Sequence, residues 1–253
     1  MPLLPSTKTR LEKVATDNGF DGPVTQDGEW LLFQSSRVPL RLWLTAMGKT
    51  IFLAALSQLH VARALTDHGL ELTSPMPQGA VAVRSVSDLV SLHHLMRRAF
   101  QLSRTLPDEL LHSFLQQTES LPRATEVERM VVQRVGQDLF RQGLLDYWEG
   151  RCAVTGLAVP ELLRSSHIKP WADCDTDAER LDIWNGFLLA PHLDAAFDRG
   201  FMTFGEDGTI KLSTALKESD RAVLGIDKSL RLRAISDGHK RYLAWHWDRV
   251  FRG

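Results

Sequence analysis

The stretch from His167 to Asp198 constrains the fold more than any other part of the chain. A short predicted strand ends near His167, and an Asn-Gly pair, beginning at Asn185, follows further along. Residues 191–197 then fit the start of a helix, because a proline opens the segment. Asp194 and Asp198 are four residues apart, so their carboxylates project from one face of that helix. The order predicts a strand, a connection and a helix that gather four polar groups.

These residue types match the needs of phosphodiester hydrolysis, which takes a base for water, a group that orients the base, and a divalent cation. His167 would be the base, since its pKa lies near neutrality. The Asn185 side chain would orient the histidine ring by hydrogen bonding, although Asn-Gly is also an ordinary turn pair. Asp194 and Asp198 offer hard oxygen ligands, which favour Mg²⁺ or Mn²⁺. The segment therefore predicts a metal-dependent nuclease, against the alternative of helix-capping or surface aspartates and a core histidine.

Three neighbouring residues are weaker site predictions. His192 precedes Asp194 by two residues and is a candidate third metal ligand, although the residue at such a position often points outward. Arg199 and Lys169 are candidates for binding the substrate phosphate. Each of the two is equally well explained as a surface residue.

The segment resembles the HNH endonucleases of the ββα-metal type, over roughly residues 125–253. In that family a histidine ends the first strand, an asparagine follows, and metal ligands stand nine and thirteen residues after the asparagine. Counted from Asn185, these offsets fall on Asp194 and Asp198. The resemblance implies that His167 is the general base, Asn185 the orienting residue, and the two aspartates the metal ligands.

Further pieces resemble bacterial restriction-type HNH proteins: Arg134-Val135-Gly136-Gln137, Phe140-Arg141, Cys152-Ala153-Val154-Thr155-Gly156, Phe197-Asp198-Arg199-Gly200 and Tyr242-Leu243-Ala244-Trp245-His246. The chain also departs from the family. Many members carry an Asp or His ligand before the base, where this chain has Ser166. The four-cysteine zinc site of some relatives is absent, which leaves Cys152 and Cys174 as buried or loop thiols.

The expected fold class is α+β, with a small mixed α/β domain at 1–105, a linker helix region at 106–123 and a ββα-metal nuclease domain at 124–253. Predicted strands of the first part are Trp30–Gln34, Leu40–Ala46, Thr50–Leu56 and Ala80–Arg84, and its predicted helices are Leu59–Asp67 and Val86–Leu102. A linker helix is expected over Asp108–Gln116. In the last part we expect a helix from a Thr125 cap to Tyr147, a strand and turn at Cys152–Gly156, a strand at Ser165–Ile168, a hairpin of Phe201–Phe204 with Thr209–Leu212, and a helix over Asp237–Phe251.

Composition sets the broad class. The chain has 253 residues, of which 43% are hydrophobic and 24% charged, as in ordinary globular proteins. The longest apolar run, 38–56, is interrupted by Arg41 and Lys49, and the first ten residues lack a secretory pattern, so neither export nor a membrane span is expected. Two cysteines without a Cys-x-x-Cys pair favour a reducing compartment, the cytoplasm.

The net charge of −1 says nothing about partners, but the local charge does. Residues 228–253 hold seven Lys or Arg against two acids, which suits either a phosphate backbone or a solvated helix face. Because the first domain precedes the predicted nuclease domain, we hypothesise that it recognises the DNA target, such as foreign or modified DNA. Trp30, Phe33 and Trp43 suit core packing better than base stacking.

Two alternatives stay open at this stage. The first is a non-catalytic DNA-binding or regulatory protein with an HNH-derived domain. The second is a nuclease effector whose first domain senses a signal other than DNA. A homodimer would be needed for concerted cleavage of both DNA strands, and the sequence has no interface signature.

Overall fold

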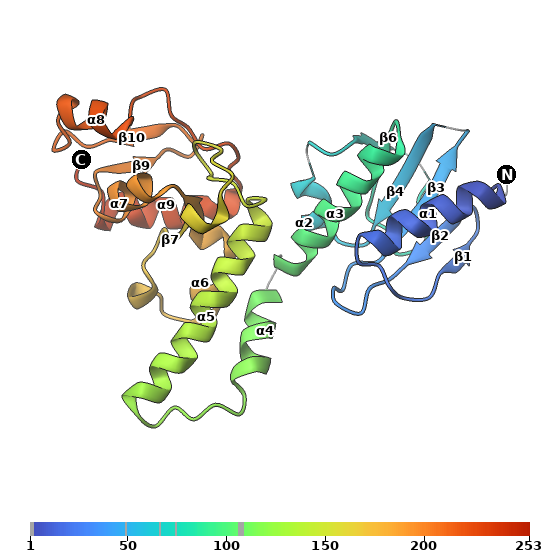
Figure 1. The fold of residues 1–253 in the computed structure, drawn as a ribbon, viewed down its shortest axis with the longest axis horizontal. Helices are drawn as coiled ribbons and strands as arrows, with labels where there is room; N and C mark the ends of the chain where they lie inside the picture. The colour runs from blue at the N-terminus through green and yellow to red at the C-terminus, as the bar shows by residue number, and fades with distance from the viewer. Residues whose placement is uncertain (1–2, 49, 66, 74, 106–108) are drawn as a thin grey trace. The chain divides into compact units, whose positions relative to one another are not determined.

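The computed structural model describes residues 3–48, 50–65, 67–73, 75–105 and 109–253, and it divides the chain into two compact units, Met1–Pro107 and Asp108–Gly253 (Figure 1). The expected mixture of helices and strands is confirmed. The helix that we expected in a linker region, α4 (Glu109–Thr118), counts with the second unit. It packs on α5 (Glu126–Tyr147) and buries Leu110 and Phe114.

The first unit is built on an antiparallel sheet of order β1-β2-β3-β4-β6-β5. Its strands are β1 (Thr25–Asp27), β2 (Trp30–Phe33), β3 (Leu42–Met47), β4 (Ile51–Leu56), β5 (Leu70–Leu72) and β6 (Ala82–Val86). Four of these match predicted strands. The short edge strands β1 and β5 were not predicted, because three-residue strands with exposed side chains leave little periodic pattern.

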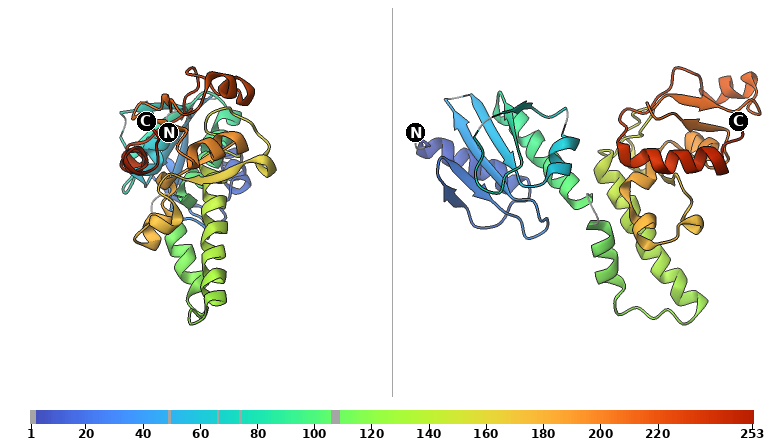
Figure 2. Two further views of the ribbon diagram at one scale, coloured as in Figure 1. Left: turned by 90° about the vertical axis from the view of Figure 1, so that its left-hand side faces the viewer. Right: turned by 180° about the vertical axis from the view of Figure 1, so that it is seen from behind.

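Helices α1 (Pro5–Asp17), α2 (Leu59–Ala64) and α3 (Leu89–Thr105) complete the first unit. Helices α1 and α3 pack against each other across one face of the sheet, and Figure 2 shows the sheet from its other side. That other face holds a cluster around Trp43, which is 1% exposed. Phe33 is equally buried. Both aromatics therefore belong to the core, as the sequence favoured.

Helix α5 leads into the second unit. Its N-terminus is capped as predicted, since the Thr125 hydroxyl accepts from Glu128 N and the Glu128 carboxylate accepts from Thr125 N. The predicted strand at Cys152–Gly156 does not form, and this stretch is a turn. The Cys152 Sγ there accepts from the backbone N–H groups of Val154, Thr155 and Ala190. Those contacts hold the turn against the N-terminal end of helix α7, without strand pairing.

The predicted strand near His167 is present as β7 (Arg164–His167), and the predicted helix is present as α7 (Pro191–Asp198). A further strand, β8 (Gly186–Leu189), lies between them and was not predicted. Strands β7 and β8 form an antiparallel pair. Between them runs the inter-strand loop, which we define as residues 168–185. It contains α6 (Asp177–Leu181) and the 3-10 turns η2 (Trp171–Asp173) and η3 (Ile183–Asn185), with η1 (Pro160–Leu162) just before β7. The architecture is a ββα unit resting on α5.

The remainder covers this unit. Strands β9 (Met202–Phe204) and β10 (Ile210–Leu212) form the predicted hairpin, and α8 (Glu218–Leu224) follows. The final helix α9 (Asp237–Arg249) packs on β9 and η3. No helix in the described ranges is long and apolar enough to cross a membrane.

Candidate active site

His167 stands at the end of β7, opposite Gly186 of β8. The imidazole stacks on Phe140 of α5, with ring centroids 3.8 Å apart, and meets the edge of Trp171 at 5.7 Å. The glycine makes this stack possible, because a Cβ at position 186 would lie 2.4 Å from the Phe140 ring. Helix α5 therefore supports the histidine through an aromatic contact that only a glycine on the neighbouring strand permits.

The hydrogen bonding of His167 defines which nitrogen is free. Its Nε2 lies 2.9 Å from the backbone oxygen of Arg180, and a carbonyl oxygen only accepts hydrogen bonds. The Nε2 atom therefore carries the proton, and Nδ1 holds a lone pair in the neutral ring. Burial lowers the pKa of His167 to about 4, so the ring is neutral at pH 7. A neutral imidazole with a free Nδ1 is able to accept a proton.

Asn185 is completely buried, and its amide bonds to the backbone of the inter-strand loop rather than to the histidine ring. The Oδ1 atom accepts from Lys169 N at 2.8 Å. The Nδ2 group donates to Lys169 O at 3.1 Å and to Glu179 O at 3.0 Å, and it also contacts the Cys174 thiol. The expected direct bond to the ring is therefore not what the structure shows. A primary amide suits this place because it donates and accepts at once, like a backbone peptide group.

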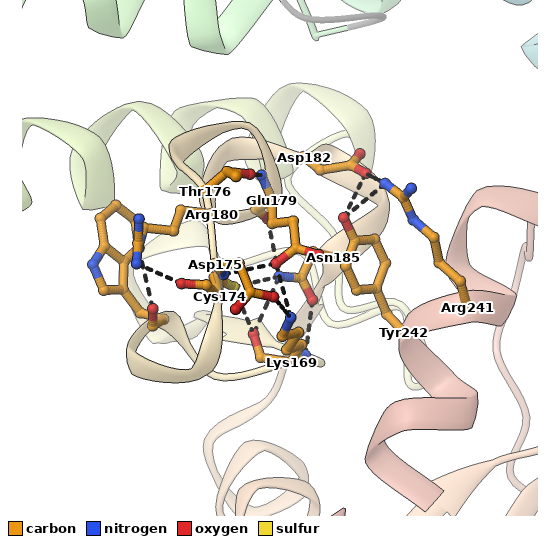
Figure 3. A network of polar contacts seen from close by, with 11 residues as sticks. Lys169, Cys174, Asp175, Thr176, Glu179, Arg180, Asp182, Asn185, Arg241 and Tyr242 are labelled. Atoms are coloured by element: carbon orange, nitrogen blue, oxygen red, sulfur yellow. Dashed lines mark hydrogen bonds and ion pairs between the residues drawn. The ribbon is translucent and has the colours of Figure 1, made fainter.

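Lys169 is 8% exposed and its ammonium is already paired (Figure 3). Its Nζ lies 2.8 Å from Glu179 Oε2 and 2.9 Å from Asp175 Oδ2. Hydrogen bonds to Glu179 and Asp175 raise the pKa of Lys169 well above its usual range. This pairing weighs against the expectation that Lys169 clamps the substrate phosphate, because two carboxylates within the protein already hold its ammonium.

The two aspartates lie on α7 beside β7. The Ser166 hydroxyl donates to Asp198 Oδ1 at 3.2 Å and also contacts Asp194. Ser166 occupies the place where the family often has a metal ligand, and here it bonds the carboxylates. Among the described residues neither aspartate forms an ion pair. The positive charges of Arg164, near Asp194, and of Arg199, near Asp198, act to lower the pKa values of the two carboxyl groups.

The electrostatics of this pair fit a bound cation. Partial burial raises the pKa of both aspartates, and the negative charge of Asp194 helps to raise that of Asp198 to about 6. The Ser166 hydroxyl and the two nearby arginines offset only part of this cost. Two carboxylates that repel each other, with hard oxygen donors and one hydroxyl between them, form a donor set suited to a divalent ion that keeps most of its water ligands.

The other predicted ligand and clamp have less support. In the stretches that the structure describes, no three His, Cys, Asp or Glu side chains converge as a metal cluster. His192 is thus not gathered with Asp194 and Asp198 into a three-ligand site. Arg199 follows α7 as its C-terminal cap and is exposed, with its charge close to Asp198.

A pocket of about 330 Å³ joins the base to the Asp198 carboxylate. It is lined by Ser166, His167 and Asp198, with Trp171, His246 and Val250 closing its sides. No individual role was predicted for His246, which is 1% exposed, stacks on Phe197 at 4.0 Å and bonds Thr203 Oγ1 and Phe197 O. These contacts bind α9 to the end of α7. The available signal was its place at the end of the Tyr242–His246 segment, which resembles restriction-type HNH proteins.

Comparison with known proteins agrees with this geometry. Residues 152–205 match the family model described as HNH endonuclease. The matched span contains β7, the inter-strand loop, β8, α7 and β9. A search of the curated proteins finds no match. The second unit of this chain therefore carries, over residues 152–205, a domain of the HNH endonuclease type.

Proposed function

We propose that the protein is a metal-dependent DNA endonuclease with its active site in the pocket between His167 and Asp198. The observation that carries this proposal is the pairing of two groups in one pocket. One is the neutral ring of His167, whose Nε2 donates to Arg180 O. The other is the carboxylate of Asp198, which lies near the like charge of Asp194 and forms no ion pair among the described residues. Hydrolysis of a phosphodiester needs both a proton acceptor and a centre of positive charge.

Asp194 and Asp198 would hold the cation, with Mg²⁺ or Mn²⁺ favoured by their oxygen donors. A divalent ion at that position supplies charge stabilisation for the phosphate and the leaving 3′ oxygen. His167 accepts the proton of the attacking water at Nδ1, while its Nε2–H stays bonded to Arg180 O. Arg199, exposed beside Asp198, is placed to bind a phosphate oxygen.

We further propose that the enzyme is of the restriction type, acting in the cytoplasm on foreign or modified DNA, with the first unit reading the target. The support is the likeness of several C-terminal segments to restriction-type HNH proteins and the presence of a separate folded unit before the nuclease domain. Cleavage of both strands by one active site per chain would require two copies of the protein.

The test is conversion of supercoiled plasmid, methylated and unmethylated, with Mg²⁺, Mn²⁺ or EDTA. The wild type is compared with His167→Ala and Asp198→Ala. Cutting that needs metal and is lost in both variants supports the nuclease and its site, and a difference between methylated and unmethylated plasmid supports target reading by the first unit. Absence of cutting by a folded, DNA-binding wild type would favour the non-catalytic alternative.

Cutting that is indifferent to methylation and to DNA sequence would leave the nuclease standing and favour the other alternative, in which the first unit senses a signal other than DNA. The same preparations, run in a sedimentation experiment with and without DNA, show whether two copies assemble on the substrate.

A further inference from the structure

The proton position on His167 depends on one backbone atom. The free base needs its proton on Nε2, so that Nδ1 can receive another, and only the Arg180 carbonyl is within hydrogen-bonding distance of Nε2 in the described chain. An imidazole that lost this acceptor would distribute its proton between both nitrogens. His167 can therefore accept a proton at Nδ1 only while Arg180 O stays within hydrogen-bonding distance of Nε2.

Arg180 lies in α6, a helix of only five residues that cannot hold its own position. Its Thr176 cap accepts from Glu179 N, and the Arg180 guanidinium donates to Trp171 O and Cys174 O and pairs with Asp177. All of these partners belong to the inter-strand loop itself. They make α6 rigid as a local unit but do not attach it to the strand that carries His167.

The Asn185 amide supplies part of that attachment, because it bonds both the Lys169 backbone and Glu179 O, and Lys169 supplies a second part through its side chain. Its backbone continues from β7, two residues after His167, and its N and O atoms bond the Asn185 amide. Its ammonium reaches across to Glu179, the residue before Arg180, at 2.8 Å. Glu179 Oε2 in turn accepts from Asp175 N at 2.9 Å. One side chain thus joins the end of the base-bearing strand to the turn of helix that presents Arg180 O (Figure 3).

We propose that Lys169, through its ion pair with Glu179, is a positioning residue that holds Arg180 O against His167 and so keeps the base in its Nε2–H form. The role in catalysis rests on the proposed function, whereas the role in positioning does not. The ion pairs that weigh against a phosphate-binding role for Lys169 are the same contacts that fix its side chain in the inter-strand loop.

The two acidic partners of Lys169 differ, and this provides a matched control. The Glu179 side chain is 31% exposed, and its residue adjoins Arg180 in α6. The Asp175 side chain is 82% exposed and precedes the helix. An ion pair with so exposed a carboxylate contributes little, because water and salt screen it. Removal of the Asp175 charge should therefore leave Arg180 O in place, while removal of the Glu179 charge should not.

The experiment reads the proton position directly. Full-length protein with ¹⁵N-labelled histidine is examined by long-range ¹H–¹⁵N correlation at pH 7.5, where the neutral tautomers give distinct nitrogen shifts. The His167→Gln variant identifies the His167 signals. We expect the Nε2–H form in the wild type, in Asp175→Asn and in Lys169→Arg, and a mixture of both tautomers in Lys169→Met and Glu179→Gln.

Plasmid cleavage by the same proteins gives the second readout. Lys169→Met should be slower by at least about tenfold, because misplacement of a catalytic group is costly, and Asp175→Asn should match the wild type. A wild-type tautomer in Lys169→Met overturns the proposal, whether or not the rate falls. An equal tautomer change in Asp175→Asn also overturns it, because the control would then act like the test.

The two proposals fail in different ways. If the tautomer changes as expected but the wild type does not cleave DNA, the positioning role stands and the nuclease proposal fails. If the tautomer changes and the cleavage rate does not, His167 is not the base. Circular dichroism and thermal unfolding establish that each variant is folded. Should Lys169→Met not fold, Glu179→Gln decides the question, because the amide retains a hydrogen-bond acceptor and loses only the charge.

Discussion

The inter-strand loop and helix α7 flank the same histidine and treat charge in opposite ways. In the loop the ammonium of Lys169 meets two carboxylates, and the buried Asn185 amide uses both its donor and its acceptor. On α7 two carboxylates lie side by side with a single hydroxyl between them. The pKa of Lys169 is raised because hydrogen bonds to Glu179 and Asp175 stabilise its ammonium, whereas the pKa of Asp198 is raised first by burial and then by the negative charge of Asp194.

This difference separates groups that maintain the fold from groups that act. A satisfied polar network lowers the energy of one conformation and holds the backbone around the base. A repelling carboxylate pair costs folding free energy in the absence of a cation, and active sites commonly accept such a cost. The comparison predicts that changes in the loop reduce stability, while changes on α7 reduce activity and increase stability.

The largest effect is expected from Asp194→Asn combined with Asp198→Asn. Loss of a metal's charge stabilisation is worth several kcal/mol, so metal-dependent cleavage should fall by about a thousandfold or more. The melting temperature without metal should rise at pH 7, because the repulsion between the carboxylates is gone. Plasmid cleavage and thermal unfolding measure the two effects. The exposed Asp220→Asn on α8 serves as the control, and a lower melting temperature in the double variant would contradict the comparison.

Asn185→Ala should have the opposite signature. Removal of the amide leaves the N–H of Lys169 and the C=O of Glu179 without their side-chain partner, and it leaves the C=O of Lys169 with only the weak Cys174 thiol donor, at a cost of about 3 kcal/mol. Urea unfolding of the metal-free protein measures this loss. A variant as stable as the wild type would show that the loop does not depend on its polar network.

The buried histidines and Asp198 should change the stability in opposite directions as the pH falls. Burial lowers the pKa of His167, His239 and His246 to about 4, so between pH 6.5 and 4 the unfolded chain binds more protons and stability falls on acidification. Asp198 acts in reverse. Its pKa is raised from 3.8 to about 6, so between these values the folded state binds more protons and the Asp198 contribution to stability rises on acidification.

Asp198→Asn should therefore lose stability more steeply than the wild type as the pH falls from 6 to 4. Chemical unfolding at a series of pH values tests this, and parallel curves for the two proteins would contradict the raised pKa of Asp198.

The smallest effect is expected from Arg199→Ala. The side chain is exposed, so solvent and salt screen its contact with a phosphate. We therefore expect kcat/KM for cleavage to fall by only a few fold, mainly through a higher KM. Comparison of initial rates at two salt concentrations isolates the charge effect. A loss as large as that of the aspartate variants would place Arg199 in the catalytic step.

The sequence predicted the strand and the helix that hold the site residues, but it did not predict all of the contacts that these residues make. The four-residue spacing between Asp194 and Asp198 predicted that they share a helix face, because helical periodicity fixes which side chains neighbour each other. Strand β8 was missed, since its four buried residues do not alternate and Asn185-Gly186 suggested a turn. The partners of Asn185 are mostly backbone atoms, which no residue pattern specifies.

Lys169 shows why a charge is hard to interpret from sequence alone. Asp175 and Glu179 follow it by six and ten residues, a spacing that corresponds to no helix or strand neighbour, so only the folded loop brings them together. Helix α1 was missed in the first unit, although Pro5 opens it and Leu11, Val14 and Ala15 form its buried face. The predicted helix over Asp108–Gln116 begins outside the described residues and continues in α4.

Binding of Mn²⁺ to the full-length protein tests the central claim most directly. Electron paramagnetic resonance of free Mn²⁺ during a titration at pH 7.5 reports the bound fraction without requiring cleavage. The account predicts a single class of site in the wild type and in Asp220→Asn, and its loss in Asp198→Asn, because that site depends on both carboxylates of α7. Wild-type binding by Asp198→Asn, or no binding by the wild type, would contradict the account.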